Sequence, residues 1–265
     1  MKELTDRLDK QNLTYEIPKD VLHYANTDIS FYVYTQSSTG GTKLSYDARI
    51  SARSSSSMAG PIATYESDVN TLIRAALLTY DNVNVISVDW SSYSFLLYTM
   101  AVSNVSNVGK TVGLFIESLL TNYDYSPDDV ILIGRSLGAH VAGYAGKELN
   151  GTLGVIVGLD PAGPLFFESN SASRLNSGNA QFLGVNYDLA DTDFWPNGEY
   201  SQPGCLLSSI CFHSRSYMYM AESIGSNQFY ARQCDSYDDY TGGACATNTL
   251  YLMGGLTFDD RSVRK

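Results

Sequence analysis

The segment of residues 134–138, with the sequence GRSLG, constrains this chain more than any other feature. It follows a β-branched apolar run at residues 130–133 and precedes the small residues of a predicted helix at 139–149. A serine between a strand and a helix stands on a tight turn, because flanking glycines admit neighbouring backbone without a Cβ clash. The pattern predicts that Ser136 lies at a helix N-terminus, where the helix dipole and the amide of Leu137 favour developing negative charge.

Short apolar runs alternate with longer helical patterns on both sides of this turn. They predict strands over residues 84–90 and 155–159 and a helix over residues 105–120. Such alternation is typical of a mostly parallel sheet flanked by helices, and with the serine turn it predicts the α/β-hydrolase fold. Since 265 residues without an evident linker suit one core, we expect a single domain covering residues 1–265.

Two parts of the chain depart from the alternation. Residues 51–57 contain five serines where a strand is expected, and they predict a flexible loop because serine supplies no apolar surface. The Tyr- and Gly-rich region near the cysteines, which follows the last predicted strand, is expected to be irregular and held by disulfides.

A serine hydroxyl becomes a strong nucleophile when a base accepts its proton and a third group holds that base. Asp160 ends the strand that follows the serine turn, so its carboxylate is expected at the same sheet edge as Ser136. Of the three histidines, His23 precedes the sheet and His140 is expected to be a hydrogen-bonded core residue. His213 remains as the candidate base, in the chain order that α/β-hydrolases use. A turn-capping aspartate and a glycine-rich packing turn are the structural alternatives.

Charge limits the partners of this chain. Lys+Arg number 17 against 28 Asp+Glu, giving a net charge of −11 that disfavours nucleic acid and electrostatic capture by anionic membranes. A neutral lipid surface is compatible with this charge. No residue pattern indicates a metal or a cofactor, and the sequence does not indicate an oligomeric state.

Cysteines and glycosylation triplets indicate the secretory pathway. Four cysteines permit three pairings, and short loops favour two local disulfides, Cys205–Cys211 and Cys234–Cys245. Disulfides imply an oxidising, extracellular setting. Asn-x-Ser/Thr triplets, which also occur by chance, stand at Asn12, Asn104 and Asn150. The first 15 residues contain no signal-like apolar stretch, so we expect that a leader has been removed.

Longer motifs resemble the pancreatic lipase family, including its insect lipases, venom phospholipases and yolk-protein relatives. They are GRSLGAHVAG, NVISVDWSSYS, GLDPAGPLF, DFWPNGEYSQPGC and CFHSRSYMYMAESI, and the trailing cysteines of the family match Cys234 and Cys245. The resemblance implies that Ser136 is the nucleophile, Asp160 the orienting carboxylate and His213 the general base. It implies an acylglycerol or phospholipid substrate, and we expect no C-terminal lipid-binding domain.

Three departures from the family bear on activity, and a fourth, at Arg135, is a lesser one. Only LLSSI stands between Cys205 and Cys211, where the family carries a lid, and the loop before DFWPNG is also short; both resemble sn-1 phospholipases. Where the family has His-Gly-aromatic, whose last amide is an oxyanion donor, this chain has SSSSMAGPIATY. With Gly60 at the family's glycine, Pro61 has no N–H to donate. Arg135 stands where the family usually has histidine or another aromatic-like residue, and it either pairs with a surface acid or obstructs the site.

Two functions fit this sequence. The first is a serine ester hydrolase acting on lipid esters, with an oxyanion hole weakened at Pro61. The second is a non-catalytic storage or lipid-carrying protein similar to insect yolk proteins. Three separated residues in triad positions favour the enzyme, whereas Pro61 and the serine run favour the carrier.

Overall fold

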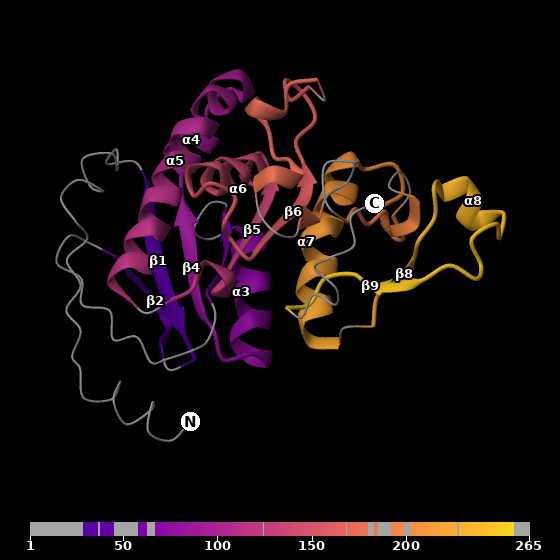
Figure 1. The fold of residues 1–265 in the computed structure, drawn as a ribbon, viewed down its shortest axis with the longest axis horizontal. Coiled ribbons are helices and arrows are strands. Elements are labelled where there is room, and N and C mark those ends of the chain that lie inside the picture. Colours follow the sequence, from indigo (N-terminus) through magenta and orange to yellow (C-terminus); the bar gives the residue numbers. More distant parts are fainter. Residues whose placement is uncertain are drawn as a thin grey trace.

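The computed structural model describes residues 29–36, 38–44, 58–62, 67–123, 125–167, 169–179, 183–184, 192–198, 202–226 and 228–256. In these residues, seven strands form one sheet with the order β2-β1-β4-β3-β5-β6-β7, and β8 and β9 form a separate antiparallel pair (Figure 1). The strands are β1 (Ser30–Thr35), β2 (Ser38–Lys43), β3 (Met58–Ile62), β4 (Asn84–Asp89), β5 (Val130–Ser136), β6 (Val155–Pro161), β7 (Leu183–Gly184), β8 (Tyr230–Arg232) and β9 (Leu250–Leu252).

The strand directions confirm a mostly parallel sheet. β1 pairs antiparallel with β2 and β4, whereas the pairs from β4 through β3, β5 and β6 to β7 are all parallel. The carboxyl ends of β3, β4, β5 and β6 therefore lie at one edge of the sheet, which is where parallel sheets carry their functional groups.

Helices cover both faces of the sheet (Figure 1). The side chains of β5 alternate, so that Val130 and Leu132 pack in the cluster of α5 and α6, and Ile131 and Ile133 pack in the cluster of α3 and α7. The helices are α3 (Asp68–Tyr80), α4 (Ser91–Ser94), α5 (Tyr98–Asn122), α6 (Leu137–Glu148), α7 (Ser209–Ser226) and α8 (Tyr237–Thr241). Short 3-10 turns occur at Pro127–Asp129, Ser171–Ser173, Ser177–Asn179 and Pro196–Gly198.

The elements predicted around the serine turn are confirmed as β4, α5, β5, α6 and β6. α5 begins seven residues before the predicted residue 105, at Tyr98. Its N-cap is Leu97, which makes no side-chain capping bond, so no capping residue marks the start of this helix in the sequence. The predicted loop at residues 51–57 lies outside the described residues, and β3 begins directly after it.

The prediction of an irregular region near the cysteines is wrong for residues 209–226. These residues form α7, which packs against α3 through Tyr217 and Met220, with Ile224 alongside. This spacing of three and four residues is the helical period. The many tyrosines and serines between these positions obscure this period in the sequence.

Both predicted disulfides are confirmed. Cys205 bonds Cys211 with a Cα–Cα distance of 5.4 Å, and Cys234 bonds Cys245 with a Cα–Cα distance of 5.6 Å. The two disulfides are consistent with an extracellular location. The helices of the described residues include none whose length and apolar character would let it cross a membrane.

Candidate active site

Ser136 ends β5 at the carboxyl edge of the sheet and is the N-cap residue of α6. Its backbone has φ 55° and ψ −123°, a left-handed conformation that serine rarely adopts, as a sharp strand-to-helix turn requires. The Ser136 side chain makes no capping hydrogen bond to α6. Leu137 is the first residue of α6, where helix geometry leaves the backbone N–H without a partner in the helix. The turn therefore joins a hydroxyl to an amide donor and the positive end of a helix dipole.

Gly134 makes this turn sterically feasible. A Cβ added at Gly134 would stand 2.2 Å from the carbonyl oxygen of Gly138, closer than any real contact of this kind. The close approach of α6 to β5 therefore excludes a side chain at this position, which is the role predicted for the glycines around Ser136.

Asp160 lies one strand away from Ser136. It is the second-last residue of β6, the parallel neighbour of β5, and the register pairs Ser136 with Pro161. Asp160 also has a positive φ, 46°. Both acidic and nucleophilic candidates thus occupy backbone conformations that are uncommon outside glycine, and such strain concentrates at functional sites.

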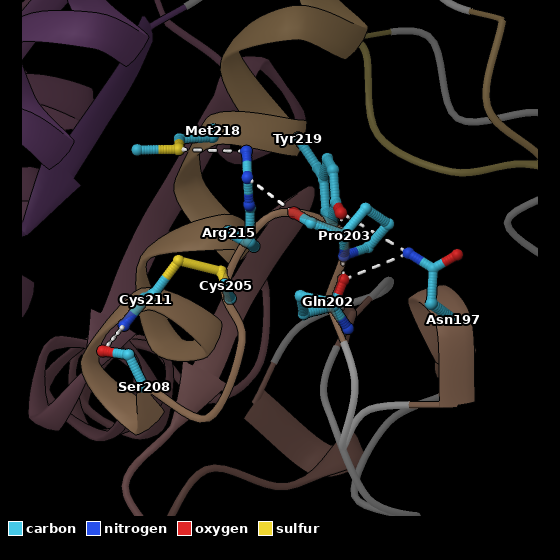
Figure 2. Close-up of a disulfide and its surroundings, with 9 residues drawn as sticks. All are labelled: Asn197, Gln202, Pro203, Cys205, Ser208, Cys211, Arg215, Met218 and Tyr219. Atoms are coloured by element: carbon cyan, nitrogen blue, oxygen red, sulfur yellow. Dashed lines mark hydrogen bonds between the residues drawn. A yellow bond between two sulfur atoms is a disulfide. The ribbon is translucent and has the colours of Figure 1, made fainter.

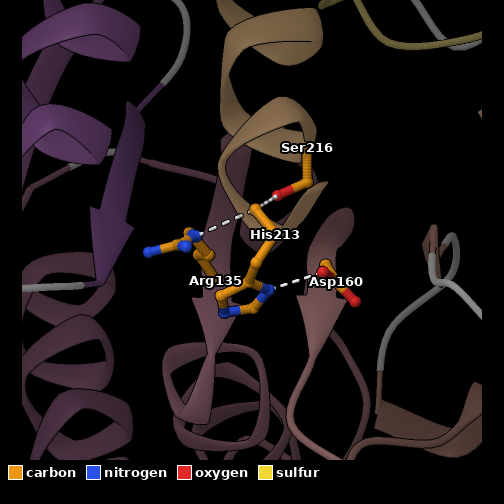
Figure 3. A network of polar contacts seen from close by, with 4 residues as sticks. All are labelled: Arg135, Asp160, His213 and Ser216. Carbon is orange, nitrogen blue, oxygen red and sulfur yellow. Dashed lines mark hydrogen bonds and ion pairs between the residues drawn. The ribbon is translucent and has the colours of Figure 1, made fainter. Parts of the chain in front are cut away.

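His213 comes from α7, on a distant part of the sequence, and meets Asp160 directly. Nδ1 of His213 lies 2.5 Å from Oδ2 of Asp160, with the two side chains 31% and 27% exposed (Figure 3). A neutral imidazole that donates from Nδ1 to a carboxylate carries no proton on Nε2. The pairing therefore leaves Nε2 as the atom that can accept a proton, and part of this pair remains open to solvent.

Arg135 and Ser216 hold the backbone of His213. The Nε–H of Arg135 donates to the His213 carbonyl at 3.3 Å, and the Ser216 hydroxyl donates to the same oxygen at 2.9 Å (Figure 3). The Arg135 guanidinium lies 5.1 Å from the ring centroid of Tyr217, also on α7. Burial lowers the pKa of Arg135, and the neighbouring Tyr217 and Asp160 partly offset this, but an arginine remains charged in proteins.

The contact of Arg135 with His213 was missed by sequence reasoning, which considered only a surface ion pair or an obstruction. Arg135 instead attaches the first turns of α7 to the serine turn. The residue before the nucleophile candidate is thereby bonded to the backbone of the base candidate. A long basic side chain at this position was the only signal in the sequence.

Pro61 lies inside β3, where it pairs with Ile133 of β5. The pairing of β3 with β4 runs through Ala59 and resumes at Ile62, skipping Gly60 and Pro61, as expected where proline has no N–H to donate. Ser136 stands three residues beyond Ile133, about 10 Å farther along the strand direction. Along the strand direction, Pro61 therefore does not reach the position of Ser136. Residues 63–66, which follow β3, lie outside the described residues.

His140 is a core residue, as predicted. Its ring is fully buried, with Nε2 2.8 Å from the Ala162 carbonyl and Nδ1 accepting the Leu175 N–H at 3.2 Å. The ring stacks on Phe166 with centroids 3.7 Å apart. Burial lowers its pKa to about 4. His140 therefore stays neutral and ties the loop after Asp160 to α6.

The Cys205–Cys211 disulfide closes a short loop that leads into α7. Figure 2 shows that Arg215 donates to the Pro203 carbonyl at 2.7 Å, and that the Cys211 N–H donates to the Ser208 hydroxyl at 3.3 Å. Nearby, Tyr219 and Asn197 both donate to the side-chain oxygen of Gln202, at 2.9 and 3.1 Å (Figure 2). These bonds hold both flanks of the loop.

The three predicted glycosylation sites differ in their surroundings. Asn104 lies inside α5, where its side-chain amide donates to the Met100 carbonyl at 2.8 Å, so its nitrogen is already engaged. Asn150 is exposed on the turn after α6. Asn12 lies outside the described residues. In the described part of the chain, no group of three or more His, Cys, Asp or Glu side chains could hold a metal ion.

Comparison with known proteins identifies the family. The sequence profile of the family described as "Lipase" matches residues 19–255. The chain belongs to the lipase family. Lipase-family membership implies the α/β-hydrolase fold, in agreement with the parallel sheet and the serine turn between β5 and α6.

Several lipases are similar to this chain. The pancreatic triacylglycerol lipase of Myocastor coypus is 37% identical over 205 residues, which cover 64% of this chain and 45% of that protein. Lipase member H of Oryctolagus cuniculus is 38% identical over 190 residues, covering 64% and 42%. Pancreatic lipase-related protein 2 of Cavia porcellus is 37% identical over 182 residues, covering 62% and 42%.

These relatives support the pancreatic lipase family without favouring its insect branch. The matched region spans less than half the length of each of these relatives. Among solved structures, the Francisella virulence factor BioJ has a TM-score of 0.32 and 15% identity, covering 45% of this chain and 41% of that chain. A likeness this distant carries no argument.

Proposed function

We propose that this lipase-family chain is a serine ester hydrolase that acts on lipid esters through Ser136, His213 and Asp160. One observation carries the proposal: the hydrogen bond of 2.5 Å between His213 and Asp160, formed at the sheet edge where Ser136 ends β5. A carboxylate that orients an imidazole, at the same edge of the sheet as a serine on a strained turn, fits the arrangement that activates a hydroxyl.

The proposed reaction gives these three residues the roles of a catalytic triad. Nε2 of His213 accepts the Ser136 proton as Oγ attacks the ester carbonyl, and Asp160 stabilises the imidazolium that forms. The Leu137 N–H and the N-terminus of α6 stabilise the oxyanion of the tetrahedral intermediate. The alcohol leaves with the proton from His213. A water molecule deprotonated by the same nitrogen then attacks the acyl carbonyl, and His213 returns the proton to Oγ of Ser136 as the fatty acid leaves.

Phospholipid is the substrate class that the disulfide loop favours. Only residues 206–210 separate Cys205 from Cys211, so this loop is too short to cover an acyl groove as a lid. Short loops at this position resemble phospholipases that cleave the sn-1 ester. We further propose that residues 1–265 form a single domain and that the protein is secreted; the shared core of β5, β6 and α7 and the two disulfides support these proposals.

Hydrolysis of a phospholipid with different acyl chains at sn-1 and sn-2 tests the function. We expect the wild type to release the sn-1 fatty acid and leave a lysophospholipid that keeps the sn-2 chain, and Ser136→Ala to release neither. Mass spectrometry of the products distinguishes the two positions. Release of the sn-2 chain, or hydrolysis of triglyceride alone, would contradict the substrate assignment.

The same experiment distinguishes the enzyme from the non-catalytic alternative. A storage or lipid-carrying protein of the same fold would bind the lipid intact, and the wild type and Ser136→Ala would behave alike. Equal, background-level release of fatty acid by the two proteins, measured on phospholipid, triglyceride and a soluble short-chain ester, would favour the carrier.

A further inference from the structure

The first two turns of α7 carry His213 but have little apolar packing of their own. Residues 209–216 include no buried residue, and Ile210 among them is 78% exposed. The first buried residue of α7 is Tyr217, which packs with Met220 in the cluster of α3. Close packing is what fixes most helices in place. The position of His213 therefore depends on polar bonds and on the Cys205–Cys211 disulfide more than on the core.

Two polar bonds reach His213 from two different strands (Figure 3). The imidazole is bonded through Nδ1 to Asp160 in β6, at 2.5 Å. The backbone carbonyl accepts the Nε–H of Arg135, next to the end of β5, at 3.3 Å. The first bond fixes the direction of the ring, but it leaves the helix backbone free to pivot around it. The second bond ties that backbone to β5, so the two together restrain both the ring and the helix.

Arg135 is well placed to relate His213 to Ser136. It is the residue directly before Ser136, so the serine turn and the start of this side chain move together. The guanidinium lies 5.1 Å from the ring centroid of Tyr217, within the range of a cation–π contact, and Tyr217 is itself only 4% exposed. Among the described residues, no carboxylate lies within salt-bridge distance of Arg135. A charged N–H also makes a stronger bond to a carbonyl than a neutral one does.

We propose that Arg135 is a positioning residue that holds His213 at the distance from Ser136 at which a proton can pass between them. The catalytic consequence rests on the proposed function, whereas the effect of Arg135 on the imidazole of His213 requires no turnover. A displacement of about 1 Å in a catalytic group can lower the rate by about 10²-fold. Because Arg135 acts through His213 and not on the substrate, its loss should lower kcat and leave KM unchanged.

Two uncharged substitutions of similar length isolate the bond to the His213 carbonyl. In Arg135→Gln the side-chain nitrogen occupies the position along the side chain that Nε has in arginine, whereas Arg135→Met has no donor. On a soluble short-chain ester we expect Arg135→Met to lower kcat by about 10²-fold with KM unchanged, and Arg135→Gln to recover most of this loss. The matched control is Arg232→Met, since Nη1 of Arg232 donates to the Asn248 carbonyl at 2.6 Å on the separate β8–β9 pair. It should leave kcat unchanged.

Proton NMR of the imidazole provides a second readout that does not depend on hydrolysis. The Nδ1 proton that His213 shares with Asp160 should give a downfield signal, identified by its absence from His213→Ala. We expect this signal to persist in Arg135→Gln and to broaden or disappear in Arg135→Met, because the helix that carries the ring is then less restrained.

Three outcomes would overturn the positioning role. They are wild-type kcat in Arg135→Met, equal losses in Arg135→Met and Arg135→Gln, and a loss expressed in KM instead of kcat. Thermal unfolding shows whether each variant is folded. If Arg135→Met does not fold, a loss of about 10²-fold in folded Arg135→Gln would still overturn the role of the bond. A wild type that hydrolyses no ester, with an imidazole signal that responds to Arg135→Met but not to Arg135→Gln, would reject the proposed function alone and keep the positioning role.

Discussion

Replacing Asp160 with asparagine should lower kcat/KM by about 10⁴-fold while the protein remains folded. The carboxylate accepts the proton of Nδ1 in His213, which leaves Nε2 free to accept a proton from Ser136. An asparagine amide can turn its NH₂ toward Nδ1 and so favour the tautomer that carries the proton on Nε2. In this tautomer Nε2 cannot accept the proton of Ser136. Initial rates on a soluble short-chain ester measure the loss without any contribution from lipid binding.

Asp89→Asn is the matched control for this substitution. Asp89 ends β4 at the same edge of the sheet, and its carboxylate accepts the Ser91 N–H at 3.0 Å. Since Asp89 does not hold the imidazole of His213 in the structure, its replacement should change kcat/KM by no more than a few-fold. Similar losses in both variants would contradict a specific role for Asp160.

Lowering the pH from 6.5 to 4 should remove about 3 kcal/mol of folding stability through His140 alone. In the folded protein burial holds the pKa of His140 near 4, whereas an unfolded chain has an ordinary histidine near 6.5. Between these two pKa values His140 is protonated in the unfolded state and neutral in the folded state. The free energy of unfolding therefore falls as the pH falls. Well above pH 6.5 both states are neutral, and His140 contributes no pH dependence.

Urea unfolding at a series of pH values measures this effect against His140→Gln. Every other titratable group is the same in both proteins, so the difference between the two slopes isolates His140. We expect the wild type to lose stability more steeply than His140→Gln between pH 6.5 and 4. Parallel slopes would mean that burial does not hold His140 neutral in the folded protein.

The centre of the fold could be predicted from the sequence because its signals are local. The strand at residues 130–133 is a continuous β-branched run, and the helix after Ser136 is marked by small residues and by Gly134. Both disulfides follow from short spacings. The identity of His213 follows from chain order, although its contact with Asp160 joins residues 53 positions apart and becomes visible only in the folded chain.

Other features depend on contacts that no local pattern carries. The bond from Arg135 to the His213 carbonyl links residues 78 positions apart, and the same guanidinium fits a surface ion pair equally well in sequence. Pro61 aligns with an oxyanion donor by motif, but the strand register sets it opposite Ile133.

Labelling with a fluorophosphonate tests the central claim most directly, because this probe reacts only with an activated serine. We expect one adduct, located on Ser136 by peptide mass spectrometry, absent in Ser136→Ala and formed far more slowly in His213→Ala and Asp160→Asn. An intact, folded protein that forms no adduct, or one that labels at the same rate without His213, would contradict a hydrolytic site at this edge of the sheet.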